Sequence, residues 1–399
     1  MKKNKYLNGI LPTILINFSI GTVYCWTLFK EAIWTYTGFG KPVVEWCFSL
    51  AIFFLGMSAA FGGKIVEKDV KKSTLITFVM VTLGWIVTGV GIQFKSAFLT
   101  VLGFGVIQGI GVGFGYITPV KTMMLWLDKS KGFAAGISIA GFALAGLIAN
   151  PMIVFFLDAL PEVYHVFYLL TGIYAVALLV SYFLIHRPEM QEPAAEIQGS
   201  FNKREIIFSK KFILLWLVFF MNIVCGLALI SQEKQIYRDI TGGQIADAMV
   251  VLYCTVSVIC NTLGRITMAS LQDKLKRNHL PYYFMALMSL GICALAAFRA
   301  RNLPETLLLM WIVNFFFGCG FGCLPNILHE HYGIRRLATV QGLMLSAWAV
   351  AGLAGNQFAM LIIGKFNLHV LYACLAGIYA LQFGVLLIWD RVVRGRNAI

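Results

Sequence analysis

Residues 250–271 read VVLYCTVSVICNTLGRITMASL, an apolar run that holds one charged residue, Arg265. A bilayer core of about 30 Å needs about 20 apolar residues per helix, so this run predicts a membrane-spanning helix. An arginine at the centre of such a helix costs roughly 2.5 to 3.5 kcal/mol on insertion scales and calls for a partner. The nearest flanking charges, Asp247 and Asp273, lie outside the run. We interpret Arg265 as a binding group for an anion that comes and goes.

Further runs of the same kind lie on both sides of this one. Together they predict an all-α polytopic membrane protein with twelve transmembrane helices, at about 7–29, 44–62, 73–93, 97–120, 132–157, 163–185, 211–231, 245–270, 280–298, 304–327, 338–363 and 367–389. The composition agrees, since 59% of the 399 residues are hydrophobic and 13% are charged, against roughly 25% charged in soluble domains. An even number of helices places both termini on one side.

The distribution of positive charge along the chain indicates its orientation in the membrane. If the termini are cytoplasmic, 22 of the 32 lysines and arginines fall on the cytoplasmic side, in short connectors and at the chain ends. The positive-inside rule therefore predicts a cell-membrane protein with both termini cytoplasmic. Because no basic face forms, the formal charge of +14 does not indicate a nucleic-acid partner. We expect the bilayer as partner, and a monomer.

The sequence contains no motif typical of a metal site, a cofactor site or an enzyme. The nine cysteines form no CxxC pair and sit in or beside apolar runs, which is typical of small hydrophobic fillers. Cys319 and Cys323 share a helix face but lack a second ligand pair, so we predict neither a metal site nor a cofactor. There is no HExxH, GxSxG or P-loop motif, and an enzyme is not expected.

The chain repeats itself with an offset of 206 residues. ALAGLIAN at 143–150 recurs as AVAGLAGN at 349–356, and Pro119 maps onto Pro325. The polar stretch around 187–210 separates the copies. We predict an N-terminal six-helix bundle at 1–186, a cytoplasmic linker at 187–210 and a C-terminal six-helix bundle at 211–399. Six helices per copy give both copies the same orientation, as in the two halves of major facilitator transporters.

Two cytoplasmic connectors resemble the loop signature of the major facilitator superfamily, a glycine followed four residues later by an acid and then by basic residues. The residues concerned are Gly63, Glu67 and Lys68 in the first copy and Asp273 and Lys274 in the second. An acid that faces a helix N-terminus can act as a conformational latch in one state. The alternative is a solvated basic loop that only sets topology.

Asn261 precedes Arg265 by four residues, so both side chains project from one face of the helix. The planar guanidinium makes two parallel hydrogen bonds to a carboxylate, and Asn261 adds a neutral donor. The alternative is that Arg265 snorkels toward the inner surface or pairs there. Lys121, near the inner end of its helix, is expected to snorkel.

Aromatic residues of other helices supply an apolar wall for a small ligand. Tyr116 is the strongest candidate, because a tyrosine hydroxyl inside a glycine-rich apolar helix needs a polar partner. The other predicted wall residues are Tyr24, Trp26, Phe317 and Trp348.

GTVYCWTLF at 21–29, GYITP at 115–119, WLDKSKG at 126–132 and NTLGR at 261–265 resemble the oxalate/formate antiporters and related monocarboxylate transporters of that superfamily. The resemblance implies the major facilitator fold, alternating access and small organic anions as substrates. It also implies that Arg265 binds the substrate, with Asn261 and Tyr116 beside it.

Two departures from this group narrow the expectation. Oxalate-carrying members have a lysine in helix 11, and residues 339–361 have none, so a singly charged substrate is favoured. Some proton-coupled members have an aspartate where Asn261 stands. No other acid lies in the interior of a predicted helix, away from its ends, so a proton relay through a buried carboxylate is not expected. His329 and Glu330 remain candidates for proton coupling.

The sequence thus predicts a secondary transporter of small monocarboxylates such as formate, lactate or pyruvate, with a proton or a counter-anion as second partner. One alternative is an exporter of lipophilic or cationic compounds, which commonly uses the buried acids that these helices lack. Another is a membrane nutrient sensor that transports nothing.

Overall fold

The computed structural model describes residues 4–188, 203–275, 279–300 and 302–394, and these residues form helices and connecting turns without a strand. Twelve helices in them are long and apolar enough to cross a membrane. The predicted fold class is therefore confirmed. All twelve predicted spans coincide with helices, because runs of about 20 apolar residues satisfy their backbone polar groups within a bilayer only as helices.

Six membrane-length segments make up the first half, and two of them are interrupted. The first segment consists of η1 (Tyr6–Ile10), α1 (Leu11–Gly21), the 3-10 turn η2 (Thr22–Cys25) and α2 (Trp26–Thr37). The fourth consists of α5 (Ala97–Thr100), the π-helical η3 (Val101–Gln108) and α6 (Gly109–Trp126). The uninterrupted helices are α3 (Lys41–Lys68), α4 (Val70–Gln93), α7 (Lys131–Ala159) and α8 (Val163–Leu184).

The second half repeats this pattern with straighter helices. It contains the short α9 (Lys203–Ile207), then α10 (Lys210–Ile240), α11 (Asp247–Gln272), α12 (Leu280–Arg299), α13 (Leu303–Tyr332), η4 (Ile334–Arg336), α14 (Leu337–Lys365) and α15 (Leu368–Arg394). The N-cap side chains of Asp69, Ser209 and Asn302 accept backbone N–H bonds and so fix where α4, α10 and α13 begin.

One helix differs from the prediction in a way that matters for function. The sequence predicted that the seventh span ends at residue 231, whereas α10 continues to Ile240. Glu233 therefore lies inside a membrane-length helix, and its side chain is buried. The sequence predicted no acid in the interior of a helix, and Glu233 shows that this prediction is wrong. Packing against neighbouring helices stabilises two further turns of α10 despite their polar residues.

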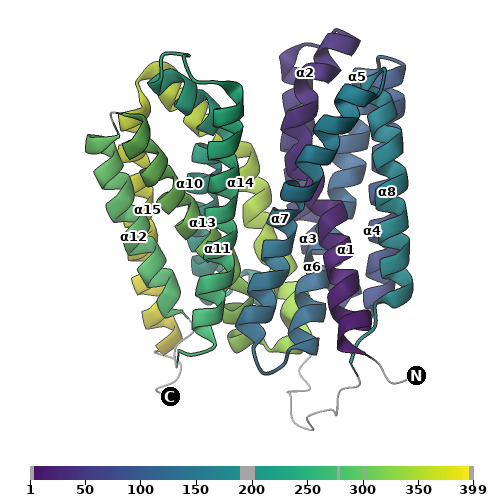
Figure 1. The fold of residues 1–399 in the computed structure, drawn as a ribbon. Coiled ribbons are helices and arrows are strands. Elements are labelled where there is room, and N and C mark those ends of the chain that lie inside the picture. The colour runs from purple at the N-terminus through teal and green to yellow at the C-terminus, as the bar shows by residue number, and fades with distance from the viewer. Residues whose placement is uncertain (1–3, 189–202, 276–278, 301, 395–399) are drawn as a thin grey trace.

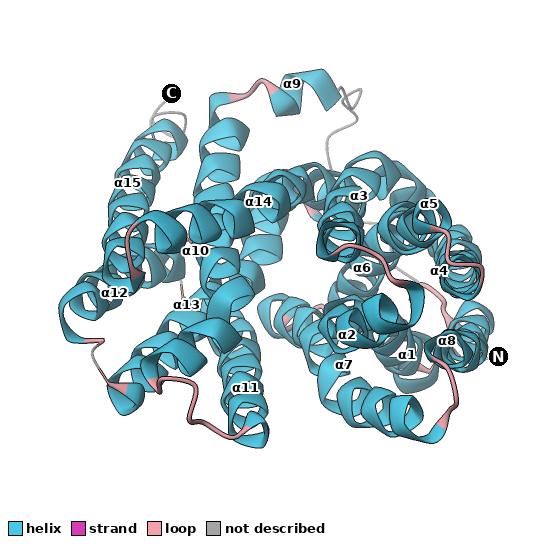
Figure 2. Ribbon diagram, turned by 90° about the horizontal axis from the view of Figure 1, so that it is seen from above, coloured by secondary structure: helices cyan, strands magenta, loops and turns pink. Residues whose placement is uncertain are grey.

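The helices form two groups that stand side by side. Figures 1 and 2 show α1–α8 in one group and α10–α15 in the other. Helix α14 of the second group packs along α3, and α11 packs along α7, so these two helix pairs join the halves. The N-terminal helix begins and the C-terminal helix ends at the same end of the molecule (Figure 1), here called the terminus end.

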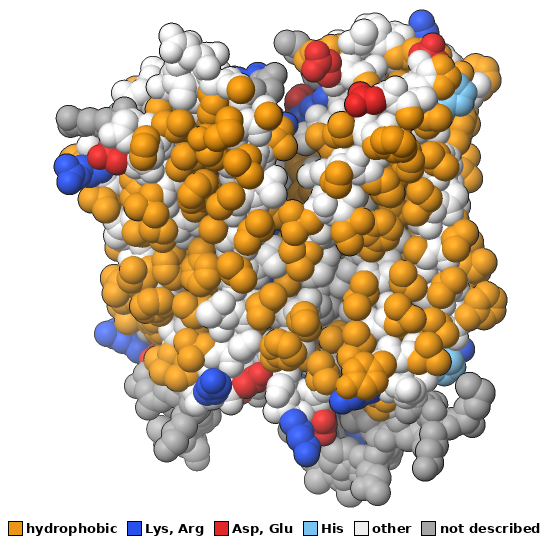
Figure 3. Space-filling view, viewed as in Figure 1, with side chains coloured by type: hydrophobic (Ala, Val, Ile, Leu, Met, Phe, Trp, Pro, Cys, Tyr) orange, Lys and Arg blue, Asp and Glu red, His pale blue; other side chains and the backbone are white. Residues whose placement is uncertain are grey.

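The surface fits a bilayer. Hydrophobic side chains form a broad band across the face shown in Figure 3, and charged side chains gather at its two ends. The chain is a multi-pass membrane protein. At the end opposite the termini, here called the open end, the same view shows the surface hollowed between the two halves.

Candidate functional site

Arg265 lies on α11 where the two halves meet, and only 3% of it is exposed. Its Nε donates to Oδ1 of Asn261 at 2.9 Å, one turn earlier on the same helix. Its Nη1 donates to the backbone carbonyl of Ile139 on α7 at 3.0 Å, across the interface between the halves. The side chain therefore does not snorkel to the surface. Its predicted pairing with Asn261 is present in the structure.

The guanidinium has spare hydrogen-bonding capacity. Among the described residues no carboxylate forms an ion pair with it, and its two hydrogen bonds go to neutral oxygens. Desolvating a charge costs several kcal/mol even after relaxation, and an amide and one carbonyl offset only part of that. A bound anion would supply the missing charge, and Nη2 remains to donate to it.

Glycines bring the neighbouring helices close to Arg265. A Cβ atom at Gly136 of α7 would lie 2.8 Å from the carbonyl oxygen of Arg265, and one at Gly322 of α13 would lie 2.8 Å from its Cα. Such distances are too short for any side chain. Both residues must be glycine for α7 and α13 to enclose α11 at this level, as small residues generally do in membrane bundles.

Aromatic rings surround the guanidinium. Its Cζ lies 5.1 Å from the ring centroid of Phe321 on α13, within the range of a cation–π contact. Trp348 of α14 packs edge-on against both Phe321 and Tyr116, with centroids 5.0 Å and 5.3 Å away. These rings come from both halves of the chain, as a site between two moving bundles requires.

Two further rings complete what we call the aromatic cluster: Tyr24, Tyr116, Phe142, Phe321 and Trp348. Phe142 of α7 lies 5.1 Å from Tyr116 and 5.5 Å from Tyr24, again edge-on. Tyr24 stands on η2, where the 3-10 turn interrupts the first segment. Both tyrosines interact electrostatically with Arg265. Their hydroxyl groups can therefore serve as neutral donors near the charge.

Two predicted wall residues occupy other positions. Trp26 donates from Nε1 to the carbonyl of Val44 at 2.8 Å and stacks 3.9 Å from Phe104, in the core of the first half. The structure does not bring it to the aromatic cluster. Phe317 contacts Phe321 at 5.4 Å and packs on Gly226, so it supports the cluster from behind.

The contribution of α7 to the site was not predicted. Phe142 and the carbonyl of Ile139 lie within GISIAGFALAG at 136–146, a stretch rich in small residues. Nothing in that stretch marks a backbone carbonyl as a ligand to an arginine 126 residues away. The one available signal was a large aromatic ring in the middle of a small-residue helix face.

At the terminus end of the molecule, two acids form hydrogen bonds between the halves. Asp273 accepts from the backbone N–H groups of Gly132 and Phe133, at 2.8 and 2.9 Å, in the first turn of α7. Glu67 accepts from the backbone N–H group of Thr339 in the first turn of α14, at 3.2 Å. Each acid thus lies at the positive end of a helix dipole in the opposite half.

The two contacts obey the internal repeat. Asp273 lies 206 residues after Glu67, and Gly132 and Phe133 lie 206 residues before Ala338 and Thr339. Gly63 belongs to the same contact, because a Cβ there would lie 2.7 Å from the carbonyl oxygen of Ala338. The predicted latch residues Lys68 and Lys274 are exposed at this end and take no part in either contact.

Lys121 is buried, which differs from the prediction that it snorkels. Only 3% of its side chain is exposed, and Nζ lies 2.5 Å from Oε2 of Glu67 and donates to the carbonyl of Ile334. It joins α6 and α3 of one half to η4 of the other. His329 of α13 meets Lys131 of α7 at 2.8 Å nearby, so the halves are held together at the terminus end.

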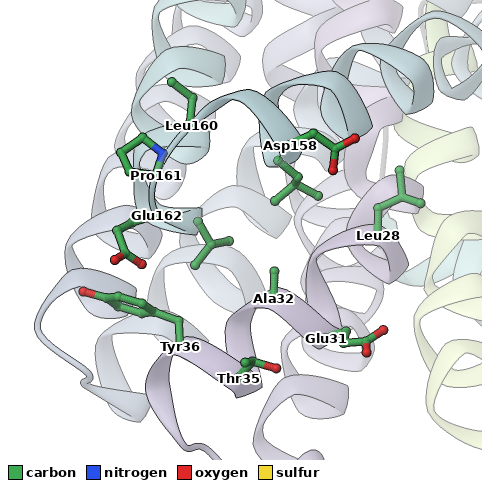
Figure 4. Close-up of a pocket in the computed structure, with 11 residues that line it drawn as sticks. Leu28, Glu31, Ala32, Thr35, Tyr36, Asp158, Leu160, Pro161 and Glu162 are labelled. Atoms are coloured by element: carbon green, nitrogen blue, oxygen red, sulfur yellow. The ribbon is translucent and has the colours of Figure 1, made fainter.

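A polar pocket of about 500 Å³ opens elsewhere, between α2 and the turn joining α7 to α8. Figure 4 shows Glu31, Asp158 and Glu162 around it, together with Tyr36 and Thr35. None of the residues of the aromatic cluster lines this pocket. Its acidic rim makes it unsuited to an anion.

Comparison with known proteins identifies the fold. The profile of the Major Facilitator Superfamily matches residues 10–395. The chain belongs to this superfamily. The resemblance inferred from the motifs is thereby confirmed at the level of the superfamily, whose members carry small molecules across membranes.

Relatives within the superfamily include transporters of small acids. The chain is 22% identical over 369 residues to the oxalate:formate antiporter of Oxalobacter formigenes, covering 91% of this chain and 86% of that protein. It is 23% identical over 352 residues to YhjX, an uncharacterised MFS-type transporter of Escherichia coli K12, covering 86% and 85%. A shorter match, over 56% of this chain and 52% of the relative at 22% identity, is with apicoplast pyruvate carrier 1 of Toxoplasma gondii.

Solved structures of superfamily members share the fold at low identity. The transporter FucP in its outward conformation gives a TM-score of 0.68 at 16% identity, covering 96% of this chain and 97% of that one. The human organic anion transporter MFSD10 gives 0.69 at 14% identity, covering 94% and 97%. These likenesses establish the architecture of this superfamily member.

Proposed function

We propose that this protein carries small monocarboxylates of the formate, lactate or pyruvate type across the cell membrane by alternating access. The observation that carries the proposal is Arg265, a buried cation at the interface of the halves that no described acid neutralises. Its hydrogen bonds leave donors for a carboxylate, Tyr116 and Tyr24 add neutral polar groups, and Asn261 orients the guanidinium. The named activities of the Oxalobacter and Toxoplasma relatives support this substrate class.

Because Arg265 supplies a single positive charge, the site favours a substrate with a single negative charge. The only other buried cation described in the structure, Lys121, is neutralised by Glu67. Residues 339–361, which belong to α14, include no lysine or arginine. Neighbouring rings of the aromatic cluster have centroids 5.0 to 6.1 Å apart, and this close packing near Arg265 favours a small acid. A dianion would bring one uncompensated charge into the low-dielectric interior.

The geometry also supports a transport cycle. We propose that the six-helix bundles at 1–186 and 211–399 rock about the contacts of α3 with α14 and of α7 with α11. In the arrangement described here the contacts of Glu67 and Asp273 close the terminus end, while the other end is open. With cytoplasmic termini, as the positive-inside rule predicts, this is an outward-facing state.

An exporter of cations fits less well. Such exporters commonly use buried acids, and Glu233 is one. A cationic substrate in the aromatic cluster would still be repelled by Arg265, whose charge no described acid cancels. Binding of a cationic dye that survives Arg265→Gln and is lost in Glu233→Gln would favour the exporter.

Ligand-dependent thermal stability tests the proposed function. Purified protein is heated with formate, lactate, pyruvate, oxalate and succinate in turn. A ligand present at 100 times its Kd stabilises the folded state by about 2.7 kcal/mol, so at least one monocarboxylate should raise the melting temperature. Arg265→Gln should abolish that rise, whereas the exposed Arg299→Gln should preserve it. Stabilisation by the dicarboxylates alone would refute the single-charge argument, and no stabilisation by any acid would refute the substrate class.

A further inference from the structure

Glu233 is a buried acid that the proposed anion site does not use. Only 5% of it is exposed, and it lies about two turns from the open end of α10. Acids inside membrane-length helices are costly and mark functional positions by default.

The partners of Glu233 are hydroxyl groups. The hydroxyl of Tyr237, one turn later on α10, donates to Oε1 at 2.6 Å. The side chain of Ser257 on α11 lies near the same carboxyl group. Among the described residues no lysine, arginine or histidine pairs with it.

The charged and titratable groups around it supply no positive charge to the carboxyl. They are Cys254 and Cys260 on α11, Tyr372 on α15 and Tyr237 on its own helix. Lys234, the next residue on α10, is exposed, and its charge acts on Cys254. An ionised carboxylate in these surroundings has lost its hydration without gaining a cation. A proton is the smallest cation that can compensate it.

Hydrogen bonds lead from Ser257, which lies near Glu233, to Arg265. Ser257 accepts from Nδ2 of Asn314 at 2.5 Å, and the backbone carbonyl of Asn314 accepts from Asn261 at 3.1 Å. Asn261 in turn accepts from Arg265. Residues 257, 261 and 265 follow one another at intervals of four and so share one face of α11.

We propose that Glu233 is a proton-binding site whose occupancy is coupled, along this face of α11, to anion binding at Arg265. The coupling rests on the proposed function, whereas proton binding at Glu233 does not. A proton from the open end adds to the carboxylate, and no bond other than this O–H forms or breaks. The anion at Arg265 and the proton at Glu233 then neutralise two buried charges together, and the protein becomes a proton-linked carboxylate carrier.

The size of the coupling follows from distance. Eight residues of α11 separate Ser257, which lies near Glu233, from Arg265. We take this rise, about 12 Å at 1.5 Å per residue, as the scale of the separation between the two charges. With an effective dielectric constant of about 20, unit charges at that distance influence each other by about tenfold in an equilibrium constant. An anion that cancels the charge of Arg265 should therefore tighten proton binding at Glu233 about tenfold. By reciprocity, the proton should tighten anion binding by the same factor.

Infrared difference spectroscopy tests proton binding without any substrate. Acidifying the purified protein should produce the carbonyl band of a protonated carboxylic acid. Glu233→Gln should remove this band, and Asp239→Asn, an exposed carboxylate on the same helix, should keep it. Tyr237→Phe keeps the packing but removes the hydrogen bond to Oε1, so it should shift the frequency of the band. An identical spectrum in wild type and Glu233→Gln would overturn the proposal, as would a band that Tyr237→Phe leaves unmoved.

Binding of pyruvate, formate and lactate at several pH values tests the coupling. In the wild type and in Asp239→Asn, the Kd of the probe that binds should rise about tenfold as the Glu233 band disappears. In Glu233→Gln it should stay constant over that range. A Kd with the same pH dependence in Glu233→Gln would overturn the coupling and leave the carboxylate function standing. If no probe binds at any pH while the Glu233 band titrates, the carboxylate function fails and the proton site stands.

Discussion

The two helix pairs that join the halves share one backbone design and differ in where a cation lies. In the pair α3–α14, Ala59 packs against Gly342, and Glu67 caps α14. In the pair α7–α11, the equivalent positions 206 residues away hold Arg265 against Gly136, and Asp273 caps α7. The first interface therefore has a small residue at the level where the second has a charge.

The cation that accompanies the first interface is Lys121, and the repeat places Ile327 at its equivalent position. Lys121 is neutralised by Glu67 within the protein, whereas no described acid neutralises Arg265. One charge thus closes the terminus end, and the other is kept for a ligand. A buried cation therefore indicates a binding site only where no neighbouring acid neutralises it.

Removing Lys121 should cause the largest loss of stability. Lys121→Met leaves Glu67 partly buried without its cation, and breaking a buried pair costs about 3 to 5 kcal/mol. The melting temperature of the purified protein should fall clearly. Glu67→Gln combined with Lys121→Met should recover part of the loss, because no unpaired charge remains. A melting temperature unchanged in Lys121→Met would show that the pair is not needed to hold the halves together.

The corresponding change at Arg265 should affect binding and spare stability. Losing one partner of a buried, hydrogen-bonded charge pair costs about 2 to 5 kcal/mol, so Arg265→Met should weaken carboxylate binding about 30-fold or more. Arg265→Lys should recover little, because an ammonium cannot form the two parallel bonds. Binding is measured by calorimetry and stability by thermal unfolding. A fall in melting temperature as large as that of Lys121→Met would show that Arg265 is structural and would remove the contrast between the two cations.

The matched glycines test whether the interfaces are mechanically equivalent. Gly136→Ala and Gly342→Ala both insert a methyl group where helices touch, and such overpacking costs about 1 to 3 kcal/mol. Both should lower thermal stability to a similar degree. Only Gly136→Ala should also weaken carboxylate binding, since it displaces the helix that carries Ile139 and Phe142. Equal loss of binding in both variants would indicate that the site senses the whole interface.

The smallest effect should come from the helix caps. Asp273→Asn keeps an oxygen that can accept from Gly132 or Phe133 but loses the charge at the positive end of α7, about 0.3 to 1 kcal/mol. Glu67→Gln should cost more, because it also removes the ion pair of Glu67 with Lys121. Amide hydrogen exchange in residues 131–136 and 337–342 reports each contact separately. Faster exchange only in 131–136 is expected for Asp273→Asn, and exchange unchanged in both variants would argue against the caps.

Much of the site could be predicted because its members carry local signals. Arg265 is conspicuous as a charge in an apolar run, Asn261 lies one turn away, and Tyr116 is a polar ring in a glycine-rich helix. Trp26 shows the limit of such signals. It belongs to the same motif as Tyr24, yet its indole is bonded to Val44 in a separate core. Neighbours in sequence on a helix point in different directions, and only packing decides which one faces the site.

The sequence by itself determined the twelve helices, the duplication and the charge of Arg265 on α11, which has no counterpart in the other copy. Hydrophobic length, repeat offset and charge are properties of the chain. Only the tertiary structure decided that Lys121 has an acid and Arg265 has none. It also placed Ile139 and Phe142 beside the guanidinium and buried Glu233 between hydroxyl groups. The physical reason is that the cost of a buried charge depends on which helices surround it, and residues far apart in the sequence supply those helices.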